Sequence, residues 1–161
     1  MEHLKKKYGE AAVARFSSPG NPLDTAAAKC GITFNKSRRV INTLDGHRVI
    51  EFCREKDPSG ELSKKAMEVM FRKYFSEGLD LSKTEELASV GEEVGVGKEE
   101  IIGLLGTDKY KSEIMDKDTS FKSSGVSGVP FFIVGSGSNR VSFSGAQPPD
   151  VIAELLEDMK K

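Results

Sequence analysis

An uninterrupted apolar run near the C-terminal end is the strongest pattern in the chain. Residues 129–134 are VPFFIV, bounded by Gly128 and Gly135. A run of this length between glycines predicts a short strand that is buried on both faces. Pro130 lacks an N–H and therefore favours the first position of a strand. We expect the chain to enter a sheet at this proline.

The segment after this run predicts a partner strand and a helix. Residues 135–139, GSGSN, are typical of a turn, and residues 140–143 alternate between polar and apolar side chains. The two runs are therefore expected to pair as an antiparallel hairpin. Pro148 and Pro149 suit the first positions of a following helix. The apolar face of that helix is predicted to comprise Val151, Ile152, Leu155, Leu156 and Met159.

Helical periodicity dominates the chain before the hairpin. Apolar spacing, caps and breakers predict helices over 2–16, 23–29, 43–55, 61–77, 82–94, 98–105 and 108–122. The helix over 61–77 is the most amphipathic, and its inward face is predicted to carry Leu62, Ala66, Met67, Met70, Phe71, Tyr74 and Phe75. We therefore divide the chain into a helical part, residues 1–124, and a strand-strand-helix part, residues 125–161.

Composition and charge narrow the class of partner. The 161 residues carry 24 basic and 25 acidic side chains without a basic patch interleaved with aromatic residues, so we expect no nucleic-acid partner. No apolar run approaches the roughly 18 residues of a membrane span, so we expect no membrane partner. The N-terminus is charged and lacks an apolar leader, which favours a cytoplasmic protein unless a targeting segment precedes Met1.

The two cysteines do not form a redox couple. Cys30 and Cys53 are separated by 22 residues, so the sequence contains no Cys-x-x-Cys motif. Both are assigned to helices, away from the N-terminal ends that lower a thiol pKa, and both are predicted to be small buried hydrophobic residues. A disulfide between them is not expected in a reducing cytosol. His3 and His47 are the only histidines and do not cluster with the cysteines, so we predict no metal site.

Several segments match the pattern of a known family. They are GVSGVPFFIV and FSGAQPPDVI near the C-terminus, and NTLDGHR at 42–48, KYFSEGLDLS at 73–82 and NPLDTAAAKCGITFN at 21–35. In these segments the chain resembles the FrnE-like branch of the DsbA-like thioredoxin family, whose relatives include hydroxychromene carboxylate isomerases and kappa-class glutathione transferases. The resemblance implies an α/β, thioredoxin-like (DsbA-type) fold with a large helical insertion. The family begins with a strand, a Cys-x-x-Cys helix start and a second strand, and this N-terminal strand-helix-strand has no counterpart here.

The resemblance implies a docking role for Val129 and Pro130. Thioredoxin-like folds keep a cis-proline opposite the dithiol, and the main chain of the preceding residue pairs with an extended thiol or peptide substrate, much as a sheet edge recruits a peptide. The alternative is a proline that only starts a strand, since proline is common at that position.

Three further residues are candidates for substrate binding. By resemblance, His47 approaches the redox site, where a histidine tunes a thiolate; the alternative is a partly buried helix histidine with a satisfied ring. Asn42 is predicted either to contact a ligand or to cap a helix, and we favour the helix cap. Gln147 occupies a position where glutathione-using relatives carry an acidic residue. Its neutral side chain argues against specific glutathione binding and favours a role in starting the last helix. We predict no cofactor. Glutathione is the one small molecule that we retain as an alternative ligand.

The apolar strand has one clear partner strand, so one of its edges needs another neighbour. Another polypeptide or a second copy of the chain could supply a strand, or a helix or the N-terminal arm could cover the edge. The third reading, a truncated product, is the one we favour, because a bare edge promotes aggregation.

The resemblance implies a member of a thiol–disulfide oxidoreductase family that docks a thiol or a peptide at residues 129–130. Because a Cys-x-x-Cys motif is missing, we do not expect this chain to complete the exchange by itself. Two alternatives stay open. The first is a glutathione-dependent isomerase or transferase, and the second is a non-catalytic binding or assembly module whose strand edge recruits a partner.

Overall fold

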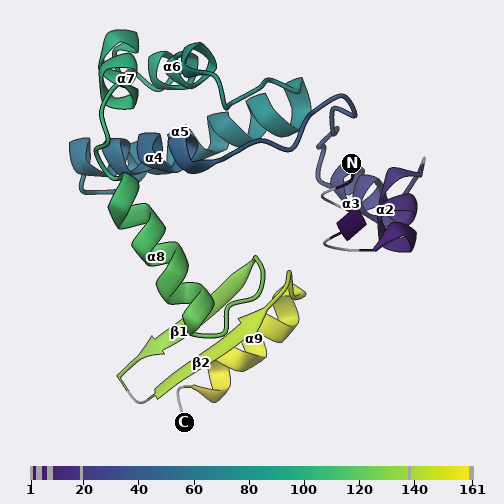
Figure 1. The fold of residues 1–161 in the computed structure, drawn as a ribbon. Coiled ribbons are helices and arrows are strands. Elements are labelled where there is room, and N and C mark those ends of the chain that lie inside the picture. The colour runs from purple at the N-terminus through teal and green to yellow at the C-terminus, as the bar shows by residue number, and fades with distance from the viewer. Residues whose placement is uncertain (1, 3–4, 7–8, 19, 138, 160–161) are drawn as a thin grey trace. The chain divides into compact units, whose positions relative to one another are not determined.

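The chain forms two compact units, residues 1–114 and residues 115–161. The computed structural model describes residues 2, 5–6, 9–18, 20–137 and 139–159, and its elements are drawn in Figure 1. Expectations that concern residues 3–4, 7–8 and 138 lie outside the described residues. The predicted α/β class is confirmed, since helices dominate the first unit and a two-stranded sheet lies in the second.

Four helices build the core of the first unit. α4 (Leu44–Lys56) packs against α5 (Glu61–Phe71), and α6 (Thr84–Glu93) packs against α7 (Lys98–Leu105). Apolar periodicity predicted both ends of α7 correctly. It predicted the ends of α4 and α6 to within two residues. The buried core comprises Val49, Ile50, Cys53, Ala66, Met70, Leu81, Leu87, Ala88, Val90, Val96, Ile101 and Leu104.

The first predicted helix is shortened in the structure, and the second is found as expected. α2 spans Glu10–Ser17, because Gly9 at its N-cap has a φ of 82°, in the left-handed region, and interrupts the single helix expected over 2–16. α3 spans Pro22–Lys29, close to the predicted 23–29. The buried Asn21 side chain caps α3 by accepting a 3.0 Å hydrogen bond from the Asp24 N–H.

The predicted helix over 61–77 is divided into two kinds of helix. α5 is followed directly by a six-residue π-helix, η1 (Arg72–Glu77). The buried face of α5 is set by Ser63, Ala66 and Met70, so the predicted inward positions of Met67 and Phe71 are wrong. Phe71 is 54% exposed and instead packs against the next turn, with its ring centroid 5.9 Å from that of Phe75.

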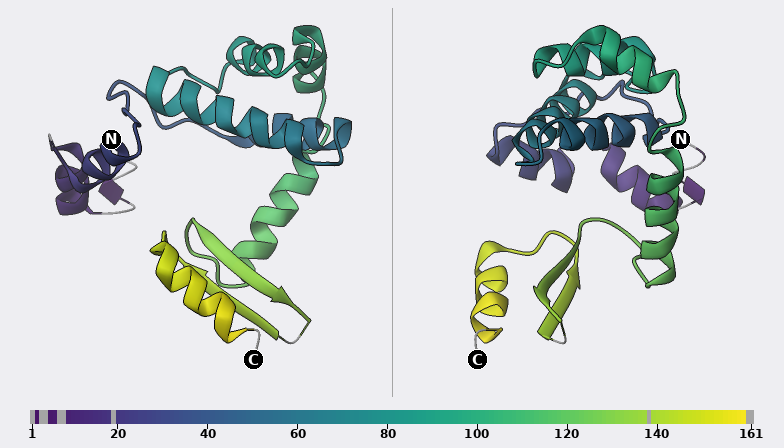
Figure 2. Two further views of the ribbon diagram at one scale, coloured as in Figure 1. Left: turned by 180° about the vertical axis from the view of Figure 1, so that it is seen from behind. Right: turned by 90° about the vertical axis from the view of Figure 1, so that its left-hand side faces the viewer.

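The second unit contains the predicted hairpin and C-terminal helix. α8 (Lys111–Ser123) starts three residues later than expected, because Tyr110 has a φ of 67° and is not helical. β1 (Phe131–Ser136) pairs antiparallel with β2 (Asn139–Ser144), as predicted, and α9 (Pro149–Asp158) follows. The hairpin lies between α9 and the C-terminal end of α8 (Figure 2).

β1 is less buried than its apolar sequence predicts. Phe132 stacks on Phe143 across the hairpin, with ring centroids 4.9 Å apart, yet Phe132 is 39% and Ile133 52% exposed. The expectation of a strand buried on both faces is therefore wrong for this chain. The physical reason is that β2 is the only strand that pairs with β1 in the part of the chain that the structure describes.

Candidate functional site

The loop that enters β1 is the centre of the candidate site. The Val129–Pro130 peptide bond is cis, and the strand starts at the next residue, Phe131. Val129 is 91% exposed, the highest value among the exposed large apolar residues. The Pro130 carbonyl accepts a 2.8 Å hydrogen bond from the Gly145 N–H, which ties the loop to the end of β2. The main chain of Val129 is thus presented to solvent beside a fixed strand end.

This hydrogen bond also shows which way the main chain of β1 points. In an antiparallel pair, hydrogen-bonded and non-hydrogen-bonded positions alternate. Since Pro130 bonds to β2, Phe132 and Val134 do the same, opposite Phe143 and Val141. The N–H and C=O groups of residues 131, 133 and 135 therefore point away from β2. No strand within the described residues pairs with them. These three residues form the free edge of β1.

A cavity of about 360 Å³ lies on one face of the hairpin, within the second unit. Phe131 and Ile133 of β1 line it together with Phe121 of α8 and Val126. Arg140 of β2 also lines the cavity, and its Nε donates a 2.9 Å hydrogen bond to the Gly137 carbonyl. Val141 and three serines, Ser120, Ser124 and Ser142, complete the lining, so the cavity is of mixed polarity with one basic side chain.

Gln147 lies at the same end of the hairpin as Pro130. Its Nε2 donates a 3.0 Å hydrogen bond to the Ser144 carbonyl, and Ser144 is the residue opposite Phe131 in the sheet. The side chain is exposed and shapes the turn from β2 into α9. Val129, Pro130 and Gln147 are thus gathered in one unit.

Asn42 and His47 belong to the other unit. The Asn42 Oδ1 accepts a 2.9 Å hydrogen bond from the Leu44 N–H at the start of α4, while the N-cap position itself is occupied by Thr43. His47 lies on the exposed side of α4, not on the partly buried side of our alternative. A contact of either residue with substrate stays a prediction.

The glycine in the same motif provides a test of helix packing. A Cβ added to Gly46, in α4, would meet only the Met70 Sδ, at an ordinary 3.8 Å. Because glycine destabilises a helix interior, Gly46→Ala should raise the free energy of unfolding by up to about 1 kcal/mol. Urea denaturation followed by circular dichroism measures this change. A lower midpoint for the variant would mean that the position needs glycine.

The thiols differ in exposure. Cys53 is buried in the core, whereas Cys30 is exposed at the end of α3, so the predicted burial is right for Cys53 and wrong for Cys30. Burial raises the pKa of the Cys53 thiol, an effect that nearby Lys56 only partly offsets. Cys53 is therefore a protonated core residue, not a nucleophile.

Titration with an aromatic disulfide reagent tests this difference. One thiol per folded chain should react readily, and both should react in denaturant. Cys30→Ser should abolish the fast reaction and Cys53→Ser should leave it unchanged. Rapid labelling of Cys53 in the folded Cys30→Ser variant would contradict its buried, protonated state.

Arg48 is the residue that sequence reasoning missed. Arg48 lies on α4, and its buried guanidinium donates hydrogen bonds to the last turn of α7 and to the loop that joins α7 to α8. The available signal was its place directly before the apolar pair Val49 and Ile50, on the face that also carries Leu44.

Among the described residues, no group of three or more His, Cys, Asp or Glu side chains is arranged to hold a metal ion. None of the described helices combines the length and the apolar character of a membrane span.

Comparison with known proteins decides the family. The family model of the DSBA-like thioredoxin domain matches residues 21–157, which include most of each unit and the Pro130 loop. This chain belongs to the DSBA-like thioredoxin domain family. The predicted thioredoxin-like fold of the DsbA type is thereby confirmed.

Two solved structures share the fold of this DSBA-like chain. One, from Streptomyces coelicolor, is described as a "probable DsbA oxidoreductase"; it is 23% identical with a TM-score of 0.77, over 97% of this chain and 64% of that one. The other, from Nitrosomonas europaea, is described as a "putative protein disulfide isomerase"; it is 17% identical with a TM-score of 0.70, over 88% of this chain and 76% of that one. The chain thus spans less than two thirds of the Streptomyces protein. The comparison with curated proteins found no match.

Proposed function

We propose that this DSBA-like chain docks an extended thiol or peptide substrate at Val129 and Pro130, for an exchange whose dithiol lies outside these residues. The observation that supports the proposal is the exposed main chain of Val129, held beside the strand end by the hydrogen bond from Gly145 to Pro130. An extended peptide that meets such a segment gains main-chain hydrogen bonds without requiring one particular side chain. The resemblance to the FrnE-like branch supports the same assignment.

The chemistry of the cysteines supports a docking role without exchange. Reduction of a disulfide needs a thiolate that attacks one sulfur and a second thiol that resolves the mixed disulfide. Cys53 is buried, and its pKa is raised by desolvation, while Cys30 is exposed at the end of another helix. The two cysteines are not bonded to each other. This chain therefore presents no adjacent dithiol.

An insulin-reduction assay tests the missing dithiol. With dithiothreitol as reductant, the chain and its Cys30→Ser, Cys53→Ser double variant should both precipitate insulin at the rate of the buffer alone. A catalysed rate that the double variant loses would show that these thiols perform the exchange and would overturn this part of the proposal. Equal, uncatalysed rates with a folded double variant are the expected result.

A glutathione-dependent activity is less well supported. Gln147 is neutral, and its Nε2 already donates a hydrogen bond to the Ser144 carbonyl. Titration with S-methylglutathione separates the two functions, since we expect weaker binding than for a peptide of several residues. Tighter binding of the glutathione derivative would favour the isomerase or transferase alternative.

A further inference from the structure

We propose that residues 107–110 form a two-state joint at the start of α8. In the interrupted state, which is the one observed, α8 begins at Lys111. In the long state the helix begins at Asp108, with Thr107 as its N-cap. Because α8 continues from the first unit into the second, the joint sets the length of the helix that connects them. This conformational device goes beyond substrate docking and does not involve Val129.

The sequence of the joint favours the long state. Threonine is a preferred N-cap residue, and the apolar pattern predicts a helix from Asp108 onward. Part of the cap is already present, because the Thr107 Oγ1 accepts a 3.2 Å hydrogen bond from the Lys109 N–H. Asp108 would add an acidic side chain to the first turn, where the helix dipole stabilises it. Local preference and the observed structure therefore disagree over residues 108–110.

A single peptide flip separates the two states. The Lys111 N–H donates a 3.1 Å hydrogen bond to the Asp108 carbonyl and closes a four-residue turn. Tyr110, the third residue of this turn, has a φ of 67°, whereas the φ of Lys109 is not positive, which is the pattern of a type II turn. That position favours glycine or asparagine, so a tyrosine is strained there. Flipping the peptide between Lys109 and Tyr110 gives a type I turn, which is compatible with a helix.

Arg48 holds this peptide in the unflipped orientation. Its Nε donates a 2.9 Å hydrogen bond to the Lys109 carbonyl, which belongs to the peptide that would flip. In the long state the same carbonyl would accept from the Glu113 N–H, because helical hydrogen bonds join residues four apart. Arg48 Nη2 also donates to the Thr107 carbonyl, which the Lys111 N–H would use in the long state. The guanidinium and the added helical turn therefore compete for these two carbonyls.

Two further contacts keep the joint next to α4. The Tyr110 hydroxyl donates a 2.5 Å hydrogen bond to one oxygen of Glu55, and the Lys109 Nζ donates a 2.8 Å hydrogen bond to the other. These bonds involve both residues that flank the flipping peptide, so they keep its carbonyl within reach of Arg48 and offset part of the strain. Arg48 belongs to the segment 42–48 that, by resemblance, approaches the redox site. The joint therefore links that segment to the start of α8.

A matched pair of substitutions at residue 110 tests the two states. Tyr110→Gly should keep the interrupted state, because glycine adopts a positive φ at little cost. Tyr110→Ala removes the same ring and hydroxyl but favours a helix over the left-handed conformation, so its ratio of long to interrupted state should be at least about tenfold higher. In NMR spectra, a strong NOE between the amide protons of residues 109 and 110 marks the flipped peptide, and a strong NOE from the 109 Hα to the 110 amide marks the unflipped one. Equal populations of the unflipped peptide in both variants would overturn the proposal.

Arg48→Lys tests what holds the joint. A single ammonium group cannot donate from separate nitrogens to the carbonyls of Lys109 and Thr107, so the NOE between the amides of residues 109 and 110 should strengthen. Arg54→Lys is the matched control and should leave this NOE unchanged, because Arg54 lies on the same helix but pairs with Glu51. A folded Arg48→Lys chain with the NOE pattern of the unmodified chain would overturn the proposal. The NOEs are measured without a peptide, so this result is independent of the docking function.

Discussion

Replacing Arg48 with methionine is expected to lower the free energy of unfolding by about 3–5 kcal/mol, a large part of the stability of a domain of this size. The guanidinium is almost fully buried, with 4% of its side chain exposed, and it binds main-chain carbonyls that lie far along the sequence. Nε donates to the Lys109 carbonyl at 2.9 Å, and Nη2 donates to the carbonyls of Leu104 at 2.9 Å and Thr107 at 2.5 Å.

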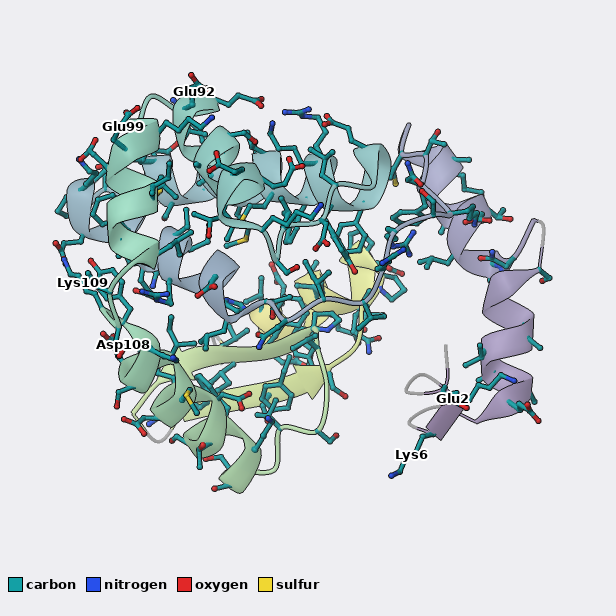
Figure 3. All side chains as sticks on the ribbon, turned by 45° about the horizontal axis from the view of Figure 1, so that its top comes forward. Glu2, Lys6, Glu92, Glu99, Asp108 and Lys109 are labelled. Atoms are coloured by element: carbon teal, nitrogen blue, oxygen red, sulfur yellow. The ribbon has the colours of Figure 1, made fainter. Side chains whose placement is uncertain are left out.

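The cost arises because the carbonyls of Thr107 and Lys109 lose their donor when the guanidinium is removed, whereas the Leu104 carbonyl keeps hydrogen bonds from the Thr107 N–H at 3.0 Å and the Thr107 Oγ1 at 2.7 Å. Arg48 also pairs with Asp45 at 2.8 Å, but that carboxylate is partly exposed and can be hydrated. The Leu104 carbonyl belongs to the last turn of α7, and the other two belong to the segment between α7 and α8, where Asp108 and Lys109 lie (Figure 3). Tyr110 in this segment has a φ of 67°, an unfavourable value for a tyrosine, so contacts with the rest of the fold must hold the segment in place. Methionine fills similar space but donates no hydrogen bond.

Urea denaturation followed by circular dichroism measures the effect, with Arg54→Met as the matched control. Arg54 is on the same helix, but it is exposed and pairs only with Glu51 at 2.7 Å among the contacts described. Its replacement should change the free energy of unfolding by about 0.5 kcal/mol or less. A similar, small loss in both variants would show that Arg48 is not needed to anchor the segment.

The second large effect is expected for Gly91→Ala. Gly91 lies in α6 where it faces α7, and an added Cβ would stand 2.4 Å from the Ile101 Cγ1. Ile101 is fully buried, so it has no free space into which it can move. Overpacking costs about 1–3 kcal/mol and outweighs the gain of up to about 1 kcal/mol that alanine gives in a helix. We expect a net loss of stability in urea denaturation.

Gly103→Ala is the matched control for this substitution. Gly103 lies in α7, and a Cβ there would meet nothing within 4 Å. That variant should be as stable as the unmodified chain or more stable, by up to about 1 kcal/mol. A double-mutant cycle with Ile101→Ala should show that Gly91→Ala costs less when the isoleucine is shortened. Full additivity of the two changes would place the clash elsewhere.

Local sequence patterns predicted most elements of the fold. The boundaries of α7 and the β1–β2 hairpin follow from apolar spacing and from turn residues that act over a few positions. The failures arise where tertiary contacts decide. Apolar periodicity cannot show that Met67 and Phe71 face outward once η1 changes the helical repeat. Nor can it show that Arg48 is buried, because its carbonyl partners are more than 50 residues away.

The candidate site was predictable in part. Val129, Pro130 and Gln147 were placed by the order strand, strand, helix, and the structure gathers them at one end of the hairpin. The exposure of Ile133 was not expected, because an apolar run predicts burial without showing whether a neighbouring strand is present. The ligand-binding roles of Asn42 and His47 depended on resemblance alone, and for Asn42 the structure shows a hydrogen bond to the start of α4.

Docking at Val129 is the central claim, and an NMR titration tests it most directly. A peptide with an S-methylated cysteine, added to the ¹⁵N-labelled Cys30→Ser, Cys53→Ser variant, cannot undergo exchange and reports binding alone. We expect the largest shifts at the amides of Val129 and Gly145, because Val129 contacts the peptide and Gly145 holds the Pro130 carbonyl. A folded protein whose Val129 and Gly145 signals do not move at millimolar peptide, or whose largest shifts lie in the first unit, would contradict the proposed function.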